Sequence, residues 1–277
     1  MIYLILAILS SALISVFMRI SGDRVKNNIS LLAVNYMTCV LVAAADAGWV
    51  LIPSGEGAGM TLLMGIVHGS FYLLSFWLLQ RNIALNGVVL SATFMKLGLL
   101  VPMAVSLILF REKPGMFQVL GFVLALAAIL LINQDEESHT VRSRSGLILL
   151  LLAGGGGDAM AKVFEELGNG SHTPQFLFYT FAAALTLCLV LVWRKKQRFG
   201  AAELGFGLLI GVPNFLSARF LLRALRTLPA VIVYPTCSVG AILAVTLAGV
   251  FLFRERLQKR QWLALGIIAA AVFFLNL

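Results

Sequence analysis

An uncharged run of 25 residues near the C-terminal end limits what this chain can fold into. The run covers residues 229–253, and a second apolar run, residues 261–277, follows after the basic segment 254–260. As a helix the first run would span about 37 Å at 1.5 Å per residue, enough to cross a hydrocarbon core of roughly 30 Å. Two such adjacent runs indicate a transmembrane helical hairpin.

The same pattern occurs earlier in the chain. Residues 110–112 (Phe-Arg-Glu) match residues 253–255 at an offset of 143. Two glycine pairs correspond at an offset of 142, namely Gly65 and Gly69 with Gly207 and Gly211. Internal self-similarity at a fixed period predicts repeated structural units. We therefore predict two repeats, residues 1–137 and 138–277, within one integral membrane domain.

Composition indicates a membrane protein. Hydrophobic residues make up 60% of the 277 residues and charged residues only 12%, against ~25% charged in soluble proteins. We expect an all-α polytopic membrane protein with ten transmembrane helices. The expected spans are approximately residues 2–20, 30–52, 60–80, 86–110, 115–132, 145–166, 174–193, 203–222, 229–253 and 261–277.

Ten spans in two repeats give five spans for each repeat. Because five is odd, the second repeat must enter the membrane from the side opposite the first. The span count therefore predicts inverted five-helix repeats, the arrangement in which two halves exchange roles around a site at the membrane midplane.

The net charge of +9 is carried mostly by the segments that join the spans. Fourteen Lys and Arg residues fall in the odd-numbered joins and four in the even-numbered joins. Cytoplasmic joins are enriched in Lys and Arg, so the count predicts cytoplasmic odd joins and external termini. Membrane orientation accounts for the basic residues better than nucleic-acid binding, which we do not expect.

The second half of the chain contains Ala224-Leu225-Arg226-Thr227-Leu228-Pro229-Ala230, then Phe253-Arg254-Glu255-Arg256-Leu257, and then Gln261 and Gly266. These residues resemble the second repeat of EamA-type proteins, which belong to the drug/metabolite transporter superfamily. The first half matches less well, because Gly87 stands where Pro229 does. The resemblance implies ten helices in two repeats, alternating access, a central cavity and cytoplasmic termini. The last expectation is opposite to the charge count.

The residues and the resemblance together predict a secondary transporter in the cytoplasmic membrane. We expect it to move a small polar metabolite, an amino acid or a related compound, by alternating access, with export as a candidate direction. The alternatives are an intramembrane enzyme acting on a lipid-linked substrate, and a non-transporting membrane sensor or assembly subunit. Expected partners are a small-molecule substrate and the lipid bilayer, with protons as a candidate coupling ion. We expect no catalytic residues, cofactor or metal, and a monomer or homodimer.

Lys96 is the sharpest site candidate because it lies ten residues into a 25-residue span. Ionisable groups at this depth are costly and normally face the bundle interior with a partner. Lys96 is predicted to attract an anionic substrate group or to titrate during transport, or else to be a neutralised structural lysine. Asp158 is its predicted partner, and an i,i+4 contact of Asp158 with Lys162 is the alternative.

Uncharged polar groups complete the predicted substrate site. Tyr72 and Asn214 occupy equivalent positions in the third and eighth spans, His68 lies one turn before Tyr72, and Tyr234 lies in the ninth span. Each has an alternative role as an interhelical hydrogen-bonding group. His68 is also a candidate proton acceptor. No second histidine stands at helical spacing from His68, so a metal site is not expected.

Four further features have predicted roles outside the substrate site. The glycine run 154–157 predicts close helix packing or local unwinding that exposes carbonyl groups to a cavity. Lys162, near a span end, is expected to snorkel to the interface. Glu112 precedes a helix start, where a carboxylate favours the helix dipole. Asp46 is a weak candidate for proton coupling in a water-filled vestibule.

Overall fold

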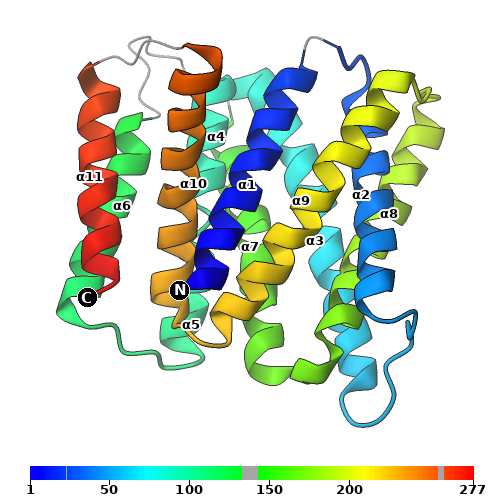
Figure 1. The fold of residues 1–277 in the computed structure, drawn as a ribbon, viewed down its shortest axis with the longest axis horizontal. Coiled ribbons are helices and arrows are strands. Elements are labelled where there is room, and N and C mark those ends of the chain that lie inside the picture. Colours follow the sequence, from blue (N-terminus) through cyan, green and yellow to red (C-terminus); the bar gives the residue numbers. More distant parts are fainter. Residues whose placement is uncertain (23, 133–142, 255–258) are drawn as a thin grey trace. The chain divides into compact units, whose positions relative to one another are not determined.

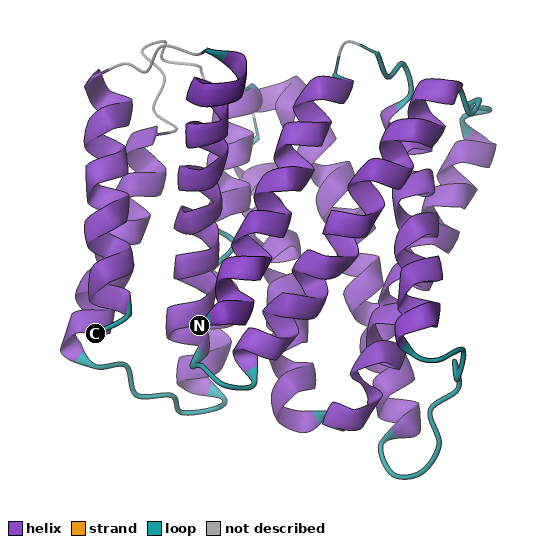
Figure 2. Cartoon of the chain, in the orientation of Figure 1, coloured by secondary structure: helices purple, strands orange, loops and turns teal. Residues whose placement is uncertain are grey.

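The computed structural model describes residues 1–22, 24–132, 143–254 and 259–277. These residues form helices joined by short loops, and none of them forms a strand (Figure 2). The helices are α1 (Ile2–Ser21), α2 (Asn28–Asp46), α3 (Ala58–Asn86), α4 (Val88–Leu97), α5 (Leu100–Ile108), α6 (Met116–Ile132), α7 (Arg144–Leu167), η1 (Gly170–His172), α8 (Thr173–Arg194), α9 (Ala201–Leu225), α10 (Ala230–Phe253) and α11 (Lys259–Leu275) (Figure 1). The predicted all-α membrane fold with ten spans is confirmed, with α4 and α5 as the two halves of one span.

The fourth span was expected to be continuous over residues 86–110, but it breaks between α4 and α5 at Gly98 and Leu99. Pro102 has no backbone N–H with which to reach the carbonyl of Gly98 four residues earlier. That carbonyl instead accepts a hydrogen bond from the backbone amide of Val101, at 2.9 Å. The amide of Gly98 donates to Met95, at 3.2 Å, so the backbone tightens into i→i+3 bonds at the break.

The described chain clusters into two compact units. Unit 1 comprises residues 1–73 and 163–223, and unit 2 comprises residues 74–162 and 224–277. Each unit therefore contains spans from both predicted repeats. The predicted repeat boundary, at residues 137 and 138, lies outside the described residues, and the division into residues 1–137 and 138–277 stays a prediction.

Unit 1 is built around the antiparallel pair α2 and α8. The thiol of Cys188, near the end of α8, lies 3.4 Å from the carbonyl oxygen of Ile29 at the start of α2. At the other end, Gln175 donates from its side-chain amide to the carbonyl of Val50, at 2.9 Å. These helices are the second and seventh spans, and antiparallel packing is the direction that inverted repeats require.

Two glycine pairs bring neighbouring helices onto this pair. Gly65 and Gly69 of α3 approach the backbone of α8 so closely that a Cβ would collide with it. Gly207 and Gly211 of α9 approach α2 in the same way. These approaches make the four glycines contact faces, because small residues let membrane helices pack backbone to backbone.

Unit 2 contains a second antiparallel pair, α6 and α11. The ring of Phe117, near the start of α6, stacks on Phe274, near the end of α11, with centroids 6.2 Å apart. Gly121 of α6 lies against the backbone of Ala271 and Leu275. The pair joins the fifth and tenth spans, so equivalent spans run antiparallel in this unit as well. Residues of α5 and α10 pack on it to form a buried apolar core.

The joins of unit 1 lie at two opposite ends. At one end Glu203 accepts hydrogen bonds from the backbone amides of Lys26, at 2.9 Å, and Asn27, at 3.1 Å. At the other end the side chain of Asn169 donates to the carbonyl of Glu56, at 3.5 Å. The first and seventh joins are thus together, as are the second and sixth, which agrees with the alternation that ten spans predict.

Candidate functional site

The six residues predicted for a substrate site fall into two groups of three. His68, Tyr72 and Asn214 belong to unit 1, and Lys96, Asp158 and Tyr234 belong to unit 2. Each group is described within its own unit.

Lys96 lies in the last turn of α4, directly before the break that separates α4 from α5. Its side chain remains exposed although protein atoms surround it densely. Asp158 of α7 is half-buried and belongs to the same unit as Lys96. The pairing of these two charges stays a prediction.

The glycine run of α7 packs on the break that follows Lys96. A Cβ on Gly155 would collide with the carbonyl oxygen of Gly98, and a Cβ on Gly98 would lie 2.9 Å from the amide nitrogen of Gly155. The break is therefore packed directly on α7, three residues before Asp158. Because α7 is helical throughout residues 144–167, the run serves close packing, and the alternative of local unwinding is wrong.

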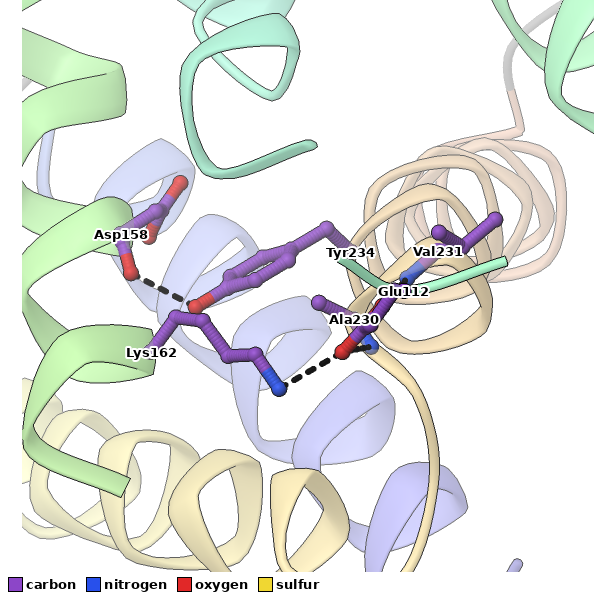
Figure 3. Close-up of polar contacts among 6 residues, drawn as sticks. All are labelled: Glu112, Asp158, Lys162, Ala230, Val231 and Tyr234. Atoms are coloured by element: carbon purple, nitrogen blue, oxygen red, sulfur yellow. Dashed lines mark hydrogen bonds and ion pairs between the residues drawn. The ribbon is translucent and has the colours of Figure 1, made fainter. Parts of the chain in front are cut away.

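Tyr234 of α10 connects to the same part of α7. Its hydroxyl donates a hydrogen bond to the backbone carbonyl of Asp158, at 2.6 Å (Figure 3). The contact fixes the position of α10 on α7 at the level of Asp158. Pro235 follows inside α10, and a proline inside a helix leaves one carbonyl of the preceding turn without its usual donor.

Lys162 does not snorkel as expected, because its side chain is only 2% exposed. Its Nζ lies 2.7 Å from Oε1 of Glu112, and 5.7 Å from the centre of the Phe110 ring. The ion pair gives Lys162 a partner other than Asp158, so the i,i+4 alternative is not the main contact of this lysine.

Glu112 also caps the start of α10. Its Oε1 accepts from the backbone amide of Ala230, at 3.2 Å, and its Oε2 accepts from the amide of Val231, at 3.5 Å (Figure 3). The first amides of a helix lack intrahelical partners, and the positive end of the helix dipole favours a carboxylate. Sequence reasoning placed Glu112 before the start of the next helix in the chain, whereas its carboxylate caps α10. Lys162 was not predicted as its partner.

In unit 1, His68 is buried in a stack of aromatic rings. Its Nδ1 lies 3.2 Å from the hydroxyl of Thr180, and its ring stacks on Phe176 with centroids 5.3 Å apart. The Thr180 hydroxyl donates its single proton to the carbonyl of Phe176, at 2.8 Å. Because a hydroxyl has one proton, we assign the proton of the His68–Thr180 bond to Nδ1 of the imidazole.

Tyr72 continues this stack. Its ring centroid lies 4.8 Å from His68, 6.0 Å from Phe181 and 6.5 Å from Tyr36. Tyr36 was not predicted, because an aromatic residue within an apolar span gives no signal that separates a site residue from core. The structure places it parallel to Tyr72, with an interplanar angle of 3°.

Asn214 donates from its side-chain amide to Oδ1 of Asn35, at 3.3 Å, and so links α9 to α2. This is the interhelical hydrogen bond that the sequence left open as an alternative.

Asp46 also has a partner in unit 1. Its carboxylate receives a two-point contact from Arg219, at 3.0 Å from Nε and 3.3 Å from Nη2. Asp46 is thus an ion-pair residue.

Among the residues that the structure describes, no group of three or more His, Cys, Asp or Glu side chains is arranged to hold a metal ion.

Comparison with known proteins gives a family match for the C-terminal part of the chain. Residues 144–277 match the model of the EamA-like transporter family. An uncharacterized protein of Haemophilus influenzae is 24% identical over 98% of this chain and 96% of its own length. A crystal structure with 14% sequence identity has a TM-score of 0.75 and covers 99% of this chain and 94% of that chain, a likeness of fold alone.

The EamA-like half supplies Asp158, Asn214 and Tyr234, whereas Lys96, Tyr72 and His68 lie outside the matched residues. The protein is therefore a multi-pass membrane protein, and its C-terminal half matches the model of a transporter family.

Proposed function

We propose that this EamA-like protein is a secondary transporter that moves a small polar metabolite across the cytoplasmic membrane by alternating access. Two observations support the proposal. The C-terminal half matches the model of a transporter family, and equivalent spans pack antiparallel within each unit, α2 with α8 and α6 with α11. Inverted repeats of this kind let the two halves exchange roles, so that a site opens to either side in turn.

Lys96 is the central residue of the proposed substrate site. A charge in the middle of a span costs about 2.5–3.5 kcal/mol on insertion scales, so it is rarely present without a functional reason. Its exposed side chain has the accessibility that a residue along a substrate passage needs. The break after Lys96 resembles the discontinuous helices whose ends bind substrates and ions in other transporters.

In this proposal Lys96 engages an anionic group of the substrate and Asp158 competes for the same cation. When the passage is empty, Asp158 neutralises Lys96 and lowers the cost of keeping the lysine charged within the membrane. The negative end of the α4 dipole adds to this, because Lys96 lies in the last turn of that helix. When the substrate binds, its anionic group replaces Asp158 as the partner of Lys96.

Of the three unit 1 residues, Tyr72 is proposed as a further substrate contact. Tyr72 is half-buried at the end of the aromatic stack, and an aromatic side chain offers both an apolar face and a hydroxyl. His68 and Asn214 are already engaged by Thr180 and Asn35. We propose that these two residues act mainly by holding the surrounding helices in place.

Uptake into liposomes tests the proposal. Purified protein would be reconstituted and screened with radiolabelled amino acids, sugars and nucleotide metabolites, first for uptake and then for counterflow. We expect saturable uptake of at least one anionic or zwitterionic metabolite, and its loss in Lys96→Met. Lys259→Gln, which removes an exposed lysine at the start of α11, is the matched control and should transport like wild type. Normal transport by folded Lys96→Met would contradict the assigned role of Lys96.

A further inference from the structure

A cleft of about 730 Å³ lies at the C-terminal end of α8 in unit 1. It is lined by Leu189, Val192, Trp193, Arg194, Lys196 and Gln197. None of the six predicted substrate residues lines it. The cleft belongs to the seventh join, which the distribution of Lys and Arg places on the cytoplasmic side.

The lining divides into an apolar part and a cationic part. Leu189 and Trp193 are exposed, and Trp193 has 79% of its surface accessible. Arg194, the residue after Trp193, and Lys196 are also exposed. Tryptophan and basic residues at a helix end are typical of the membrane interface, where apolar rings meet acyl chains and cations meet headgroups.

Positive charge is concentrated around the cleft. Lys195 and Arg198 are exposed in the same join, and Arg24 and Lys26 are exposed in the first join. The two joins are held together by a hydrogen bond from the side chain of Asn27 to the carbonyl of Arg198, at 3.3 Å. Clusters of four to eight Lys and Arg residues at the cytoplasmic end of membrane helices attract anionic lipids.

We propose that this cleft binds one anionic glycerophospholipid of the bilayer, such as phosphatidylglycerol. The phosphate lies between Arg194 and Lys196, and an acyl chain lies along Leu189 and Trp193. This inference does not rest on the proposed transport activity.

Lipid titration of the detergent-purified protein tests the site. Binding would be followed by native mass spectrometry and by the thermal unfolding midpoint, with phosphatidylglycerol, phosphatidylcholine and glycerol phosphate as three separate probes. We expect binding of phosphatidylglycerol, and roughly thirty-fold weaker binding by R194Q/K196Q, since each basic residue near an anionic surface contributes about 1 kcal/mol and 1.4 kcal/mol is ten-fold.

The control is R254Q/K259Q, which removes two exposed cations from another odd-numbered join and should bind like wild type. If R194Q/K196Q does not fold, the single variants R194Q and K196Q serve instead, each expected to bind phosphatidylglycerol about five-fold more weakly. Equal binding of the two lipids by wild type would overturn the proposal. So would an equal response to glycerol phosphate alone, or unchanged binding by the folded variants.

Discussion

Gly69 of α3 lies directly against the backbone carbonyl oxygen of Thr180 in α8, where no Cβ could be placed. The residues 142 positions away form a related contact, because Gly211 of α9 lies against the Cβ of Thr38 and the carbonyl oxygen of Asn35 in α2. Both threonines donate their hydroxyl to the carbonyl four residues earlier, at 2.8 Å for Thr180 and 2.9 Å for Thr38. A glycine thus packs against the equivalent threonine twice within unit 1.

Adding one methyl group at this contact should destabilise the protein. Gly69→Ala would drive a Cβ into the Thr180 backbone, which cannot move aside as a flexible side chain would. Overpacking of this kind costs about 1–3 kcal/mol, measurable as a lower thermal unfolding midpoint in detergent. Gly59→Ala, on the same helix with open space around it, should leave the midpoint unchanged. Equal behaviour of the two variants would show that the contact does not constrain the fold.

Removing Lys162 should lower the free energy of unfolding more than weakening a more exposed ion pair does. Lys162→Ala leaves Glu112 without its cation in a largely buried place, since the two side chains are 2% and 15% exposed. Breaking a buried pair from one side costs about 3–5 kcal/mol. Asp46→Asn, which weakens the more exposed pair with Arg219, should cost less than about 1 kcal/mol. The ranking can be read from unfolding midpoints, and the reverse order would refute it.

Tyr234→Phe should lose the hydrogen bond to Asp158 and little else. The net value of such a bond is about 0.5–1.5 kcal/mol, so we expect a modest fall in the unfolding midpoint. Tyr179→Phe is the control, because Tyr179 is half-buried and its hydroxyl makes no hydrogen bond with the described residues. A fall of the same size in both variants would assign the effect to the hydroxyl group in general, not to the contact with Asp158.

Separating Asn35 from Asn214 should loosen the contact between α2 and α9. Asn214→Leu removes the donor to Asn35 and leaves a buried amide oxygen unpaired. We expect destabilisation of about 1–3 kcal/mol, and the double variant Asn35→Leu/Asn214→Leu should recover part of it. A double-mutant cycle of unfolding free energies measures this coupling. Purely additive effects would mean that the two side chains act independently.

Hydrophobic length and repetition were enough to predict the fold class, because a run of 20 or so apolar residues has few alternatives to a membrane helix. The depth of Lys96 and Asp158 likewise led to their pairing, since membrane charges seek partners. The break between α4 and α5 was missed because hydropathy is the same on both sides of Gly98. Only the missing amide of Pro102 marks it, and a proline inside a membrane helix does not always interrupt it.

Contacts between residues that are distant in sequence were also not predicted. Glu112 and Lys162 are 50 residues apart in the chain and meet only because unit 2 folds as it does. Nothing local in the sequence joins a glutamate in a loop to a lysine near a span end. The aromatic stack around Tyr36 was missed for a related reason, because an aromatic ring in an apolar span fits a site and a core equally well.

Side-specific labelling tests the inverted arrangement most directly. Single cysteines would be introduced at Ser54, in the second join, and at Lys195, in the equivalent seventh join, of a variant in which Cys39, Cys188 and Cys237 are alanine. Both positions are exposed. A membrane-impermeant thiol reagent should label Ser54→Cys in intact cells and Lys195→Cys only after permeabilisation. Labelling of both from the same side of the membrane would contradict the account.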